Sequence, residues 1–398
     1  MSVSDRLVAA CGEVVGSGTD PGALARVVSW SVRPRRSPDA LRRAARDHPD
    51  DTVAAPSARL ATLAGPPRDD DAGAALPLVR AWADAGVRVA LVGDPGYPPR
   101  VAEGWPEVDA PAWLAWRGHP DWQAPAVAIV GARRASGYGT AVAAWLADAV
   151  ARAGVRVVSG GALGIDAAAH RAALEQPGGT TVVLGCGHAV AYPRPHATPG
   201  RLFDRIVAHG GAVVSEALPH QPPRAGPVRA RNRIVAALAD VVVVVEGGAR
   251  SGSLLTAGAS AERGRTVLAV PGDVRATGSA APHRLLAEGV APCTGPDDLL
   301  AALAAVGVPR RHPDGDGTAG GAPPGVAAAP GPPSTLPPAA RAVLARHWPR
   351  PVRLEDLAIE AALPIPTLLA ATTRAAVAGE VVETVEGLRL RRAPAPGR

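Results

Sequence analysis

The sequence predicts an α/β protein with a mostly parallel, doubly wound sheet, preceded by a small helical domain and followed by a winged helix. Between about 119 and 308, short β-branched runs alternate with helical periods, which is typical of parallel sheets covered by helices. Residues 241–245 are five consecutive valines, which suits a strand buried on both faces and predicts the sheet centre. The expected strands are 126–130, 155–158, 180–184, 212–215, 241–246 and 266–270.

The composition predicts a soluble, cytoplasmic protein. Its 398 residues, 47% of them hydrophobic, allow two or three domains with buried cores. No run of 18 apolar residues occurs, and the first residues lack the pattern of a signal peptide. Cys11, Cys186 and Cys293 are too widely separated for a disulfide framework or a CxxC metal site, so we expect neither disulfides nor metal.

The charge pattern is compatible with a polyanionic partner. The net charge is +6 and the pI is about 10.1, a mild basic bias that many other proteins share. All 42 Lys+Arg residues are arginine. The lack of lysine excludes Schiff-base chemistry and a Walker-type phosphate loop.

Residues 1–118 predict a small N-terminal helical domain that carries no catalytic signal. Ser37 followed by Pro38 resembles a helix N-cap with proline at the first helical position. Residues 54–73, with three consecutive aspartates at 69–71, predict a solvated loop. The expected elements are helices at 21–30, 37–45 and 75–85 and a strand at 87–92.

Residues 126–139, AVAIVGARRASGYG, predict a strand, a glycine turn and a helix. Backbone amides at such a helix start attract anions, and Arg133 and Arg134 add full positive charge there. The turn therefore predicts the floor of a phosphate-binding site. The dinucleotide fingerprint GxGxxG fails, because Val142 stands at the third glycine position. We therefore expect no NAD and no other cofactor.

The ends of other predicted strands are also rich in glycine and polar residues. Such runs occupy 159–166, 185–187 and 246–253. Ligands of open α/β sheets bind outside the carboxyl ends of the strands, so these runs should meet at one crevice. Residues 224–233, RAGPVRARNR, contain four arginines and no acid just before a predicted helix. We interpret them as a phosphate clamp beside the crevice.

Taken together, these motifs resemble the DNA-processing protein A family (DprA/Smf). The matching segments are VGARRASGYG, SGGALGIDAAAH, VLGCG followed by AYP at 191–193, VSE at 214–216, RNRIVAAL, VVEGGARSGSLLTA and AVPGD, in order, between about 90 and 292. The resemblance implies an extended Rossmann-like domain at 119–308 that binds single-stranded DNA, forms a homodimer and helps load RecA in natural transformation or recombination. It also implies that 1–118 is a domain of the SAM or helix-hairpin-helix type.

The resemblance also assigns DNA contacts. The positions that match the family's motifs are Arg133, Gly160, Gly164, Arg231, Asn232, Arg233, Ser251, Gly252, Ser253 and Thr256. Local charge adds Arg134, Arg224, Arg229 and Arg250. The chain departs from the family pattern at Ala189, Val228, Arg229, Ala281 and His283, on the rim of the expected site. Since this domain has few aromatic residues, we expect phosphate contacts to dominate and affinity to fall with salt.

A nucleotide-processing enzyme is the alternative. Four residues could supply acid or base groups for cleavage of the glycosidic bond of a nucleoside monophosphate: Asp166, His170, Glu216 and Glu246. The family resemblance instead favours a binding protein without catalytic residues. Release of free base from nucleoside monophosphates would separate the two hypotheses.

The remaining chain predicts a linker and a winged helix. Residues 309–338 are rich in proline and glycine without an apolar period, which indicates a flexible linker. Residues 339–398 predict helices at 339–348, 354–361 and 366–378, and a two-stranded wing around Glu386 and Gly387. The segment 363–380 carries Arg374 against Glu380, so we expect protein contact or weak DNA assistance rather than sequence-specific duplex binding.

Overall fold

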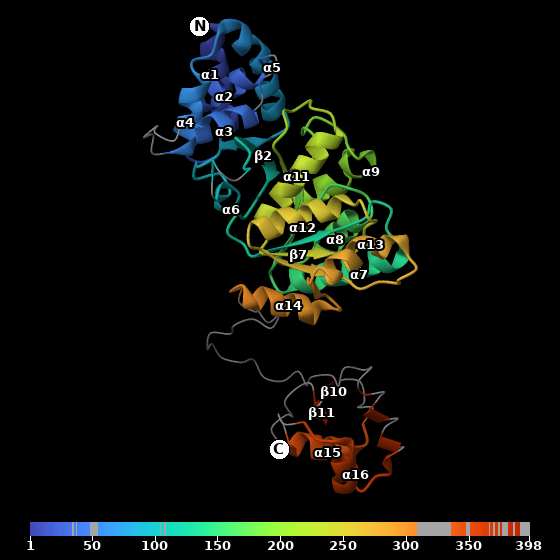
Figure 1. The fold of residues 1–398 in the computed structure, drawn as a ribbon. Coiled ribbons are helices and arrows are strands. Elements are labelled where there is room, and N and C mark those ends of the chain that lie inside the picture. Colours follow the sequence, from blue (N-terminus) through green and yellow to red (C-terminus); the bar gives the residue numbers. More distant parts are fainter. Residues whose placement is uncertain are drawn as a thin grey trace, which may run out of the picture. The chain divides into compact units, whose positions relative to one another are not determined.

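In the computed structural model the chain forms two compact units, Met1–Asp316 and Gly317–Arg398. Figure 1 traces both units along the sequence. The structure describes residues 1–390 apart from 34–35, 37, 48–54, 104, 107–108, 309–335, 348–350, 366, 369–370, 373–374, 376–380 and 385–386. The predicted linker at 309–338 lies almost entirely outside the described residues.

The first unit contains a nine-stranded sheet in the order β1-β2-β6-β5-β4-β3-β7-β8-β9. The strands from β6 to β9 in this order pair in parallel, while β1 and β2 add an antiparallel edge. The predicted α/β class is thus confirmed, with a strand at each of the six expected places. The strands are β1 (Arg88–Leu91), β2 (Trp113–Gly118), β3 (Ala126–Val130), β4 (Arg156–Gly160), β5 (Thr180–Val183), β6 (Ala212–Ser215), β7 (Val241–Val244), β8 (Thr266–Ala269) and β9 (Ala291–Pro292).

Two details of the sheet differ from expectation. The valine strand β7 is buried throughout, but it lies between β3 and β8, so β4 rather than β7 is the central strand. In addition, β1 and β2 belong to this sheet although they precede residue 119. The segment that the sequence assigns to the helical domain therefore extends the same sheet.

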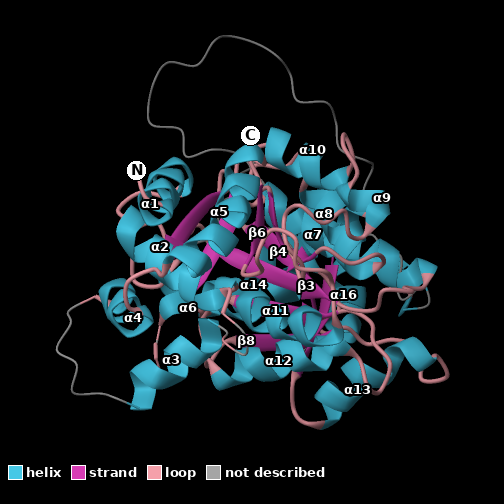
Figure 2. Cartoon of the chain, turned by 90° about the horizontal axis from the view of Figure 1, so that it is seen from above, coloured by secondary structure: helices cyan, strands magenta, loops and turns pink. Residues whose placement is uncertain are grey.

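Alternate residues of β3 face two different sets of helices. Val127 and Ile129 of β3 pack with α7 (Gly137–Arg152), α8 (Ile165–Ala173) and α14 (Pro296–Ala305). The residues between them pack on the other face with α11 (Ala225–Leu238) and α12 (Gly252–Glu262). Figures 1 and 2 show α11 and α12 over the sheet and strands enclosed by helices. This arrangement sends the chain to opposite faces after β3 and after β7.

The N-terminal helices correct one expectation. Most of the segment 54–73, expected as a loop, is helical, because α4 covers Pro56–Ala64 and α5 covers Asp69–Asp84; residue 54 lies outside the described residues. Leu60 and Leu76 are buried in the core of this unit, and the aspartates at 69–71 form the first turn of α5, where negative charge is favourable. The other helices of this region are α1 (Val3–Val14), α2 (Pro21–Ser31), α3 (Pro38–Asp47) and α6 (Pro99–Ala102).

Short elements complete the first unit. They are α9 (Arg194–Ala197), α10 (Leu202–Ala208), the 3-10 helix η1 (Thr277–Ser279) and α13 (Ala280–Ala287). Within the described ranges, no helix has the length and apolar character that a membrane span needs.

The second unit has its own small core. Helices α15 (Pro338–His347) and α16 (Leu354–Ala361) pack with the antiparallel strands β10 (Val381–Thr384) and β11 (Gly387–Leu390). Much of the third expected helix, 366–378, lies outside the described residues, as do Arg374 and Glu386. The winged helix therefore stays a prediction.

Candidate nucleic-acid interface

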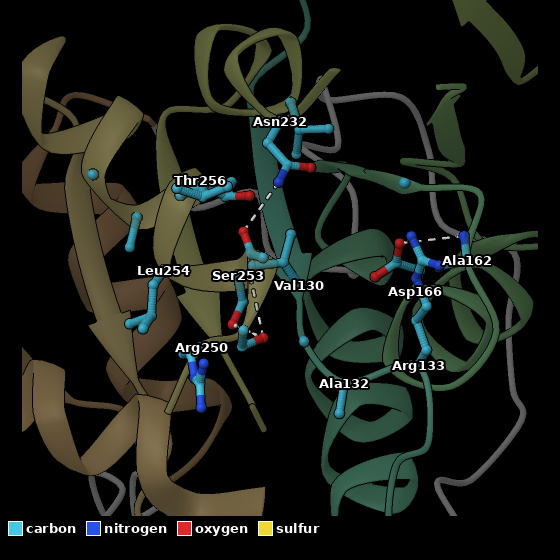
Figure 3. Close-up of a pocket in the computed structure, with 18 of the residues that line it drawn as sticks. Val130, Ala132, Arg133, Ala162, Asp166, Asn232, Arg250, Ser253, Leu254 and Thr256 are labelled. Atoms are coloured by element: carbon cyan, nitrogen blue, oxygen red, sulfur yellow. Dashed lines mark hydrogen bonds between the residues drawn. The ribbon is translucent and has the colours of Figure 1, made fainter. Parts of the chain in front are cut away.

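The ends of β3, β4 and β7 open into a groove of about 1150 Å³. Strand β3 lies between β4 and β7, and the helices that follow β3 and β7 cover opposite faces of the sheet. This is the place at which open α/β sheets bind ligands. Figure 3 shows Arg133 and Asp166 on one side of the groove and Arg250, Ser253 and Leu254 on the other.

Glycines allow the turns around the groove to touch through their backbones. Gly164 has a φ of 80°, and a Cβ there would lie 2.2 Å from the carbonyl oxygen of Ala132. A Cβ at Gly131 would lie 2.7 Å from the carbonyl oxygen of Glu246. Both contacts exclude larger residues. The turns after β3, β4 and β7 are thereby held together.

Arg231 is the innermost cation of the groove. Its side chain is 7% exposed, and its Nη1 donates a hydrogen bond of 2.8 Å to the carbonyl oxygen of Val183. The guanidinium lies directly on Gly160, where an added Cβ would fall within 1.5 Å of Nη1. Burial lowers the pKa of Arg231, and the nearby Asp166 opposes that shift. Residue 160 must therefore be glycine for this arginine to occupy its place.

Asp166 and Arg133 form the side of the groove next to α8. Asp166 is 6% exposed and accepts a hydrogen bond of 3.3 Å from the backbone N–H of Ala162. Burial raises its pKa, while the charges of Arg231 and Arg133 act in the opposite direction. Arg133 is exposed, so its guanidinium is available to an anion.

The start of α12 forms the opposite side. Ser251 is the N-cap, and its Oγ accepts hydrogen bonds from the backbone N–H of Ser253 and from Ser253 Oγ. Asn232 Nδ2 donates a hydrogen bond of 3.0 Å to the carbonyl oxygen of Gly252, which ties α11 to α12. The positive end of the α12 dipole thus faces the groove beside Arg250.

Most of the predicted contact residues meet at this groove. Those that line it are Arg133, Gly160, Arg224, Arg231, Asn232, Arg250, Ser251, Gly252, Ser253 and Thr256. Gly164 is the N-cap of α8, between the groove residues Ala162 and Asp166 in the sequence. Arg134 instead lines a second cavity, of about 1100 Å³, which shares Ala132 and Arg133 with the groove. The side chain of Arg229 lies outside the described residues.

Arg233 corrects the prediction of a continuous phosphate clamp. Its guanidinium pairs with Glu216 at 2.6 Å and with Asp109 at 3.0 Å. Arg231 and Arg233 are two residues apart on a helix of 3.6 residues per turn, so they point to opposite faces of α11. Burial alone would lower the pKa of Arg233, but these two carboxylates raise it above its usual range. Arg233 is therefore an anchor of α11 rather than a groove residue.

Sequence reasoning missed Tyr192 as a groove residue. Its ring is 38% exposed and lines both the groove and an apolar side cavity of about 170 Å³. Leu163 and Leu184 are among the apolar walls of that cavity, and Arg133 and Arg231 stand at its border. The Tyr-Pro pair at 192–193 is the sequence feature that could have indicated it.

The four candidate acid/base residues do not form one site. Asp166 lines the groove, but Glu216 pairs with Arg233 on the far face of α11. Glu246 is bonded to Ser136 in the turn before α7. His170 is fully buried, with its ring nitrogens bonded to Thr180 Oγ1 and to the carbonyl oxygen of Gly160. The four candidates therefore do not form the pair of neighbouring carboxylates that the hydrolase hypothesis requires.

Each of the three cysteines is a buried free thiol. Burial raises the pKa of Cys186, beside the groove, to about 11, so this thiol stays protonated at neutral pH. In the part of the chain that the structure describes, no three His, Cys, Asp or Glu side chains gather closely enough to hold a metal ion.

Comparisons with known proteins agree with the fold. The model of a family described as DNA recombination-mediator protein A matches residues 88–304. A Mycobacterium tuberculosis relative named for DNA processing protein DprA is 44% identical over 196 residues, 49% of either chain. The DNA processing protein DprA of Streptococcus pneumoniae is 40% identical over 194 residues, 48% of this chain and 67% of that one.

A solved structure shows the same architecture. DNA processing protein A from Streptococcus pneumoniae superposes with a TM-score of 0.54 and 28% identity, covering 70% of this chain and 96% of that chain. The chain spans about half the length of the Mycobacterium tuberculosis relative.

The pH dependence of stability tests the structural role of His170. Burial lowers its pKa from 6.5 to about 4, so the folded chain holds it neutral while the unfolded chain binds a proton near pH 6.5. Its contribution to stability is complete above pH 6.5 and falls as the pH drops toward 4. We expect the urea midpoint to fall between pH 7.5 and pH 5, and to fall less in His170→Gln. His188, with a similar pKa of about 4, retains part of the effect in the variant. A midpoint that does not change with pH would contradict this role.

Replacing Arg233 tests its assignment as an anchor. Arg233→Ala leaves the half-buried Glu216 without its partner, and we expect a loss of about 3 kcal/mol in the free energy of unfolding. The affinity of the folded variant for oligo-dT should stay within twofold of wild type. Arg133→Ala, at an exposed groove position, is the matched control and should show the reverse pattern. Urea unfolding and fluorescence anisotropy measure the two effects. If Arg233→Ala instead bound DNA tenfold more weakly at unchanged stability, Arg233 would be a DNA contact rather than an anchor.

Proposed function

Because this chain belongs to the DNA recombination-mediator protein A family, we propose that it binds single-stranded DNA in the groove and acts as a recombination mediator. The observation that carries the proposal is the groove itself. Five arginines, an amide and the start of α12 line one concave surface at the ends of parallel strands. This arrangement suits a flexible polyanion.

Phosphate contacts would supply most of the affinity. Arg133, Arg224, Arg231 and Arg250 line the groove against Asp166 and Glu288, and Glu288 already pairs with Arg284 at 2.8 Å. Each neutralised phosphate of a single strand contributes about 0.7 to the slope of log affinity against log salt. The backbone of the strand would thus be held without regard to sequence.

Tyr192 adds a contact that the composition did not predict. Its exposed ring beside the apolar side cavity offers a surface on which a base can stack. Stacking of one base on an aromatic ring is worth about 1–3 kcal/mol and tolerates any base. Stacking also favours an unpaired strand, because the bases of a duplex are covered by their neighbours.

We extend the proposal to the partners that the family implies. In this proposal the chain acts in the cytoplasm as a homodimer and helps load RecA on incoming or recombining single strands. The second unit would assist by protein contact or weak DNA binding. The groove in this proposal binds and positions DNA without cutting it.

DNA affinity measured by anisotropy tests the groove directly. For oligo-dT, we expect Arg133→Ala and Arg250→Ala each to weaken binding about tenfold and to lower the salt slope by about 0.7, because each removes one phosphate contact. Arg152→Ala is the matched control, since Arg152 is an exposed arginine of α7 paired with Asp148 away from the groove. Single-stranded DNA should bind at least tenfold tighter than duplex. Equal binding of both forms, or equal affinity of all variants, would contradict the proposal.

Mediator activity needs a separate assay. On single strands coated with a single-strand-binding protein, we expect the chain to shorten the lag of RecA filament formation, and Arg133→Ala to restore the lag because it binds DNA weakly. Light scattering during size-exclusion chromatography reports the oligomer. A wild-type chain that binds DNA but leaves the lag unchanged would limit the function to DNA binding.

A further inference from the structure

A carboxylate of the chain itself occupies the helix start at which this type of fold commonly binds phosphate. The turn after β3 leads into α7, a helix of 16 residues. In nucleotide-binding α/β folds, the N–H groups at this position and the helix dipole hold a phosphate group. Here the carboxylate of Glu246, the second residue after β7, reaches the same place.

The contacts of Glu246 resemble those of a bound anion. Its Oε2 accepts a hydrogen bond of 2.9 Å from the backbone N–H of Ser136, and its Oε1 accepts one from Ser136 Oγ. Ser136 is the N-cap of α7, and its Oγ in turn accepts a hydrogen bond of 3.0 Å from the N–H of Gly139. The carboxylate is thus bonded to the donors that a phosphate would use.

The Glu246 carboxylate is also packed closely against the first turn of α7. Glu246 is 7% exposed, and a Cβ at Gly139 would lie 2.3 Å from its Cδ. On another side, a Cβ at Gly278 would lie 3.6 Å from the same atom. Glycine at 139 is therefore needed for the carboxylate to approach α7, and the carboxylate occupies the position at the helix start that an anion would take.

The positive end of α7 balances this buried charge. The structure places Ser136 and the start of α7 against the Glu246 carboxylate, so the helix dipole and the Ser136 hydrogen bonds stabilise it. The arginines of the groove remain unpaired with it. The partial positive charge at the start of α7 is therefore balanced by a residue of the chain itself. The arginines of the groove remain available to an external partner.

The charges of the two neighbouring cavities differ accordingly. Five arginines line the groove, one of them (Arg284) paired with Glu288, whereas the second cavity combines Glu246 and Asp273 with Arg133 and Arg134. Arg134 is the basic residue that belongs to the second cavity alone. At the start of α7, an anion that enters the second cavity meets the carboxylate of Glu246.

We propose that Glu246 is a specificity-determining residue that takes the place of phosphate at α7 and excludes free nucleoside mono- and diphosphates. The proposal adds to the proposed function, on which it rests for the role of the groove. A long strand can bind along the groove without using α7, whereas a free nucleotide has one phosphate group to place and depends on such a subsite. The carboxylate would thus separate polymeric DNA from the abundant nucleotides of the cell.

Nucleotide binding by variants of the full chain tests the proposal. Fluorescent ADP and inorganic pyrophosphate are titrated into wild type, Glu246→Gln, Glu246→Ala and Asp273→Ala. We expect at least tenfold tighter ADP binding in Glu246→Ala, where both the charge and the filled volume are gone. Glu246→Gln should gain at least threefold, since it loses the charge but still fills the space. Asp273→Ala is the matched control, because Asp273 is exposed and paired with Arg275, and it should change affinity less than twofold.

The outcomes distinguish this proposal from the proposed function. Cooperative thermal unfolding shows which variants fold. If Glu246→Ala does not fold, the ADP affinity of Glu246→Gln tests the proposal. Folded variants that bind ADP and pyrophosphate no better than wild type would overturn the proposal. A wild type that already binds ADP as tightly as Glu246→Ala would overturn it as well. Failure of wild type to bind oligo-dT in a parallel titration would instead reject the proposed function and leave the nucleotide result interpretable.

Discussion

The interface depends on backbone contact between the turns that follow the parallel strands. Gly131 and Gly164 approach neighbouring carbonyl oxygens so closely that any side chain would force the turns apart. Because these turns also carry Arg133 and Asp166, such a displacement would change the shape and the charge of the groove together. The glycine-rich character of this chain is therefore a packing requirement before it is a binding feature.

Local patterns predicted the sheet well, because buried parallel strands leave continuous β-branched runs in the sequence. They failed where distant parts of the chain decide the structure. The segment 113–118 becomes β2 by pairing with β6, almost a hundred residues later in the chain. Residues 56–64 and 69–84 are helical because they bury Leu60 and Leu76 in a shared core, despite the prolines and acids that suggested a loop.

The sequence motifs predicted which residues belong to the site, but not which way their side chains point. The arginines of RNR look equivalent in the sequence, yet the helical period sends Arg231 into the groove and Arg233 to Glu216 and Asp109. Those carboxylates lie in other segments, and no spacing rule links them to α11. Glu246 likewise reads as a possible base, and only its bonds to Ser136 show that it completes a helix start.

The edges of the large sheet limit how two copies of this chain could assemble. At one edge, Val15 forms a bridge to Val89 of β1 and covers part of the strand. At the other, β9 is two residues long and ends at Pro292, which has no N–H to offer an incoming strand. Neither edge presents a long open ladder for a strand of a second copy. The sheet therefore ends at both edges without a strand that a second copy could extend by pairing along its length.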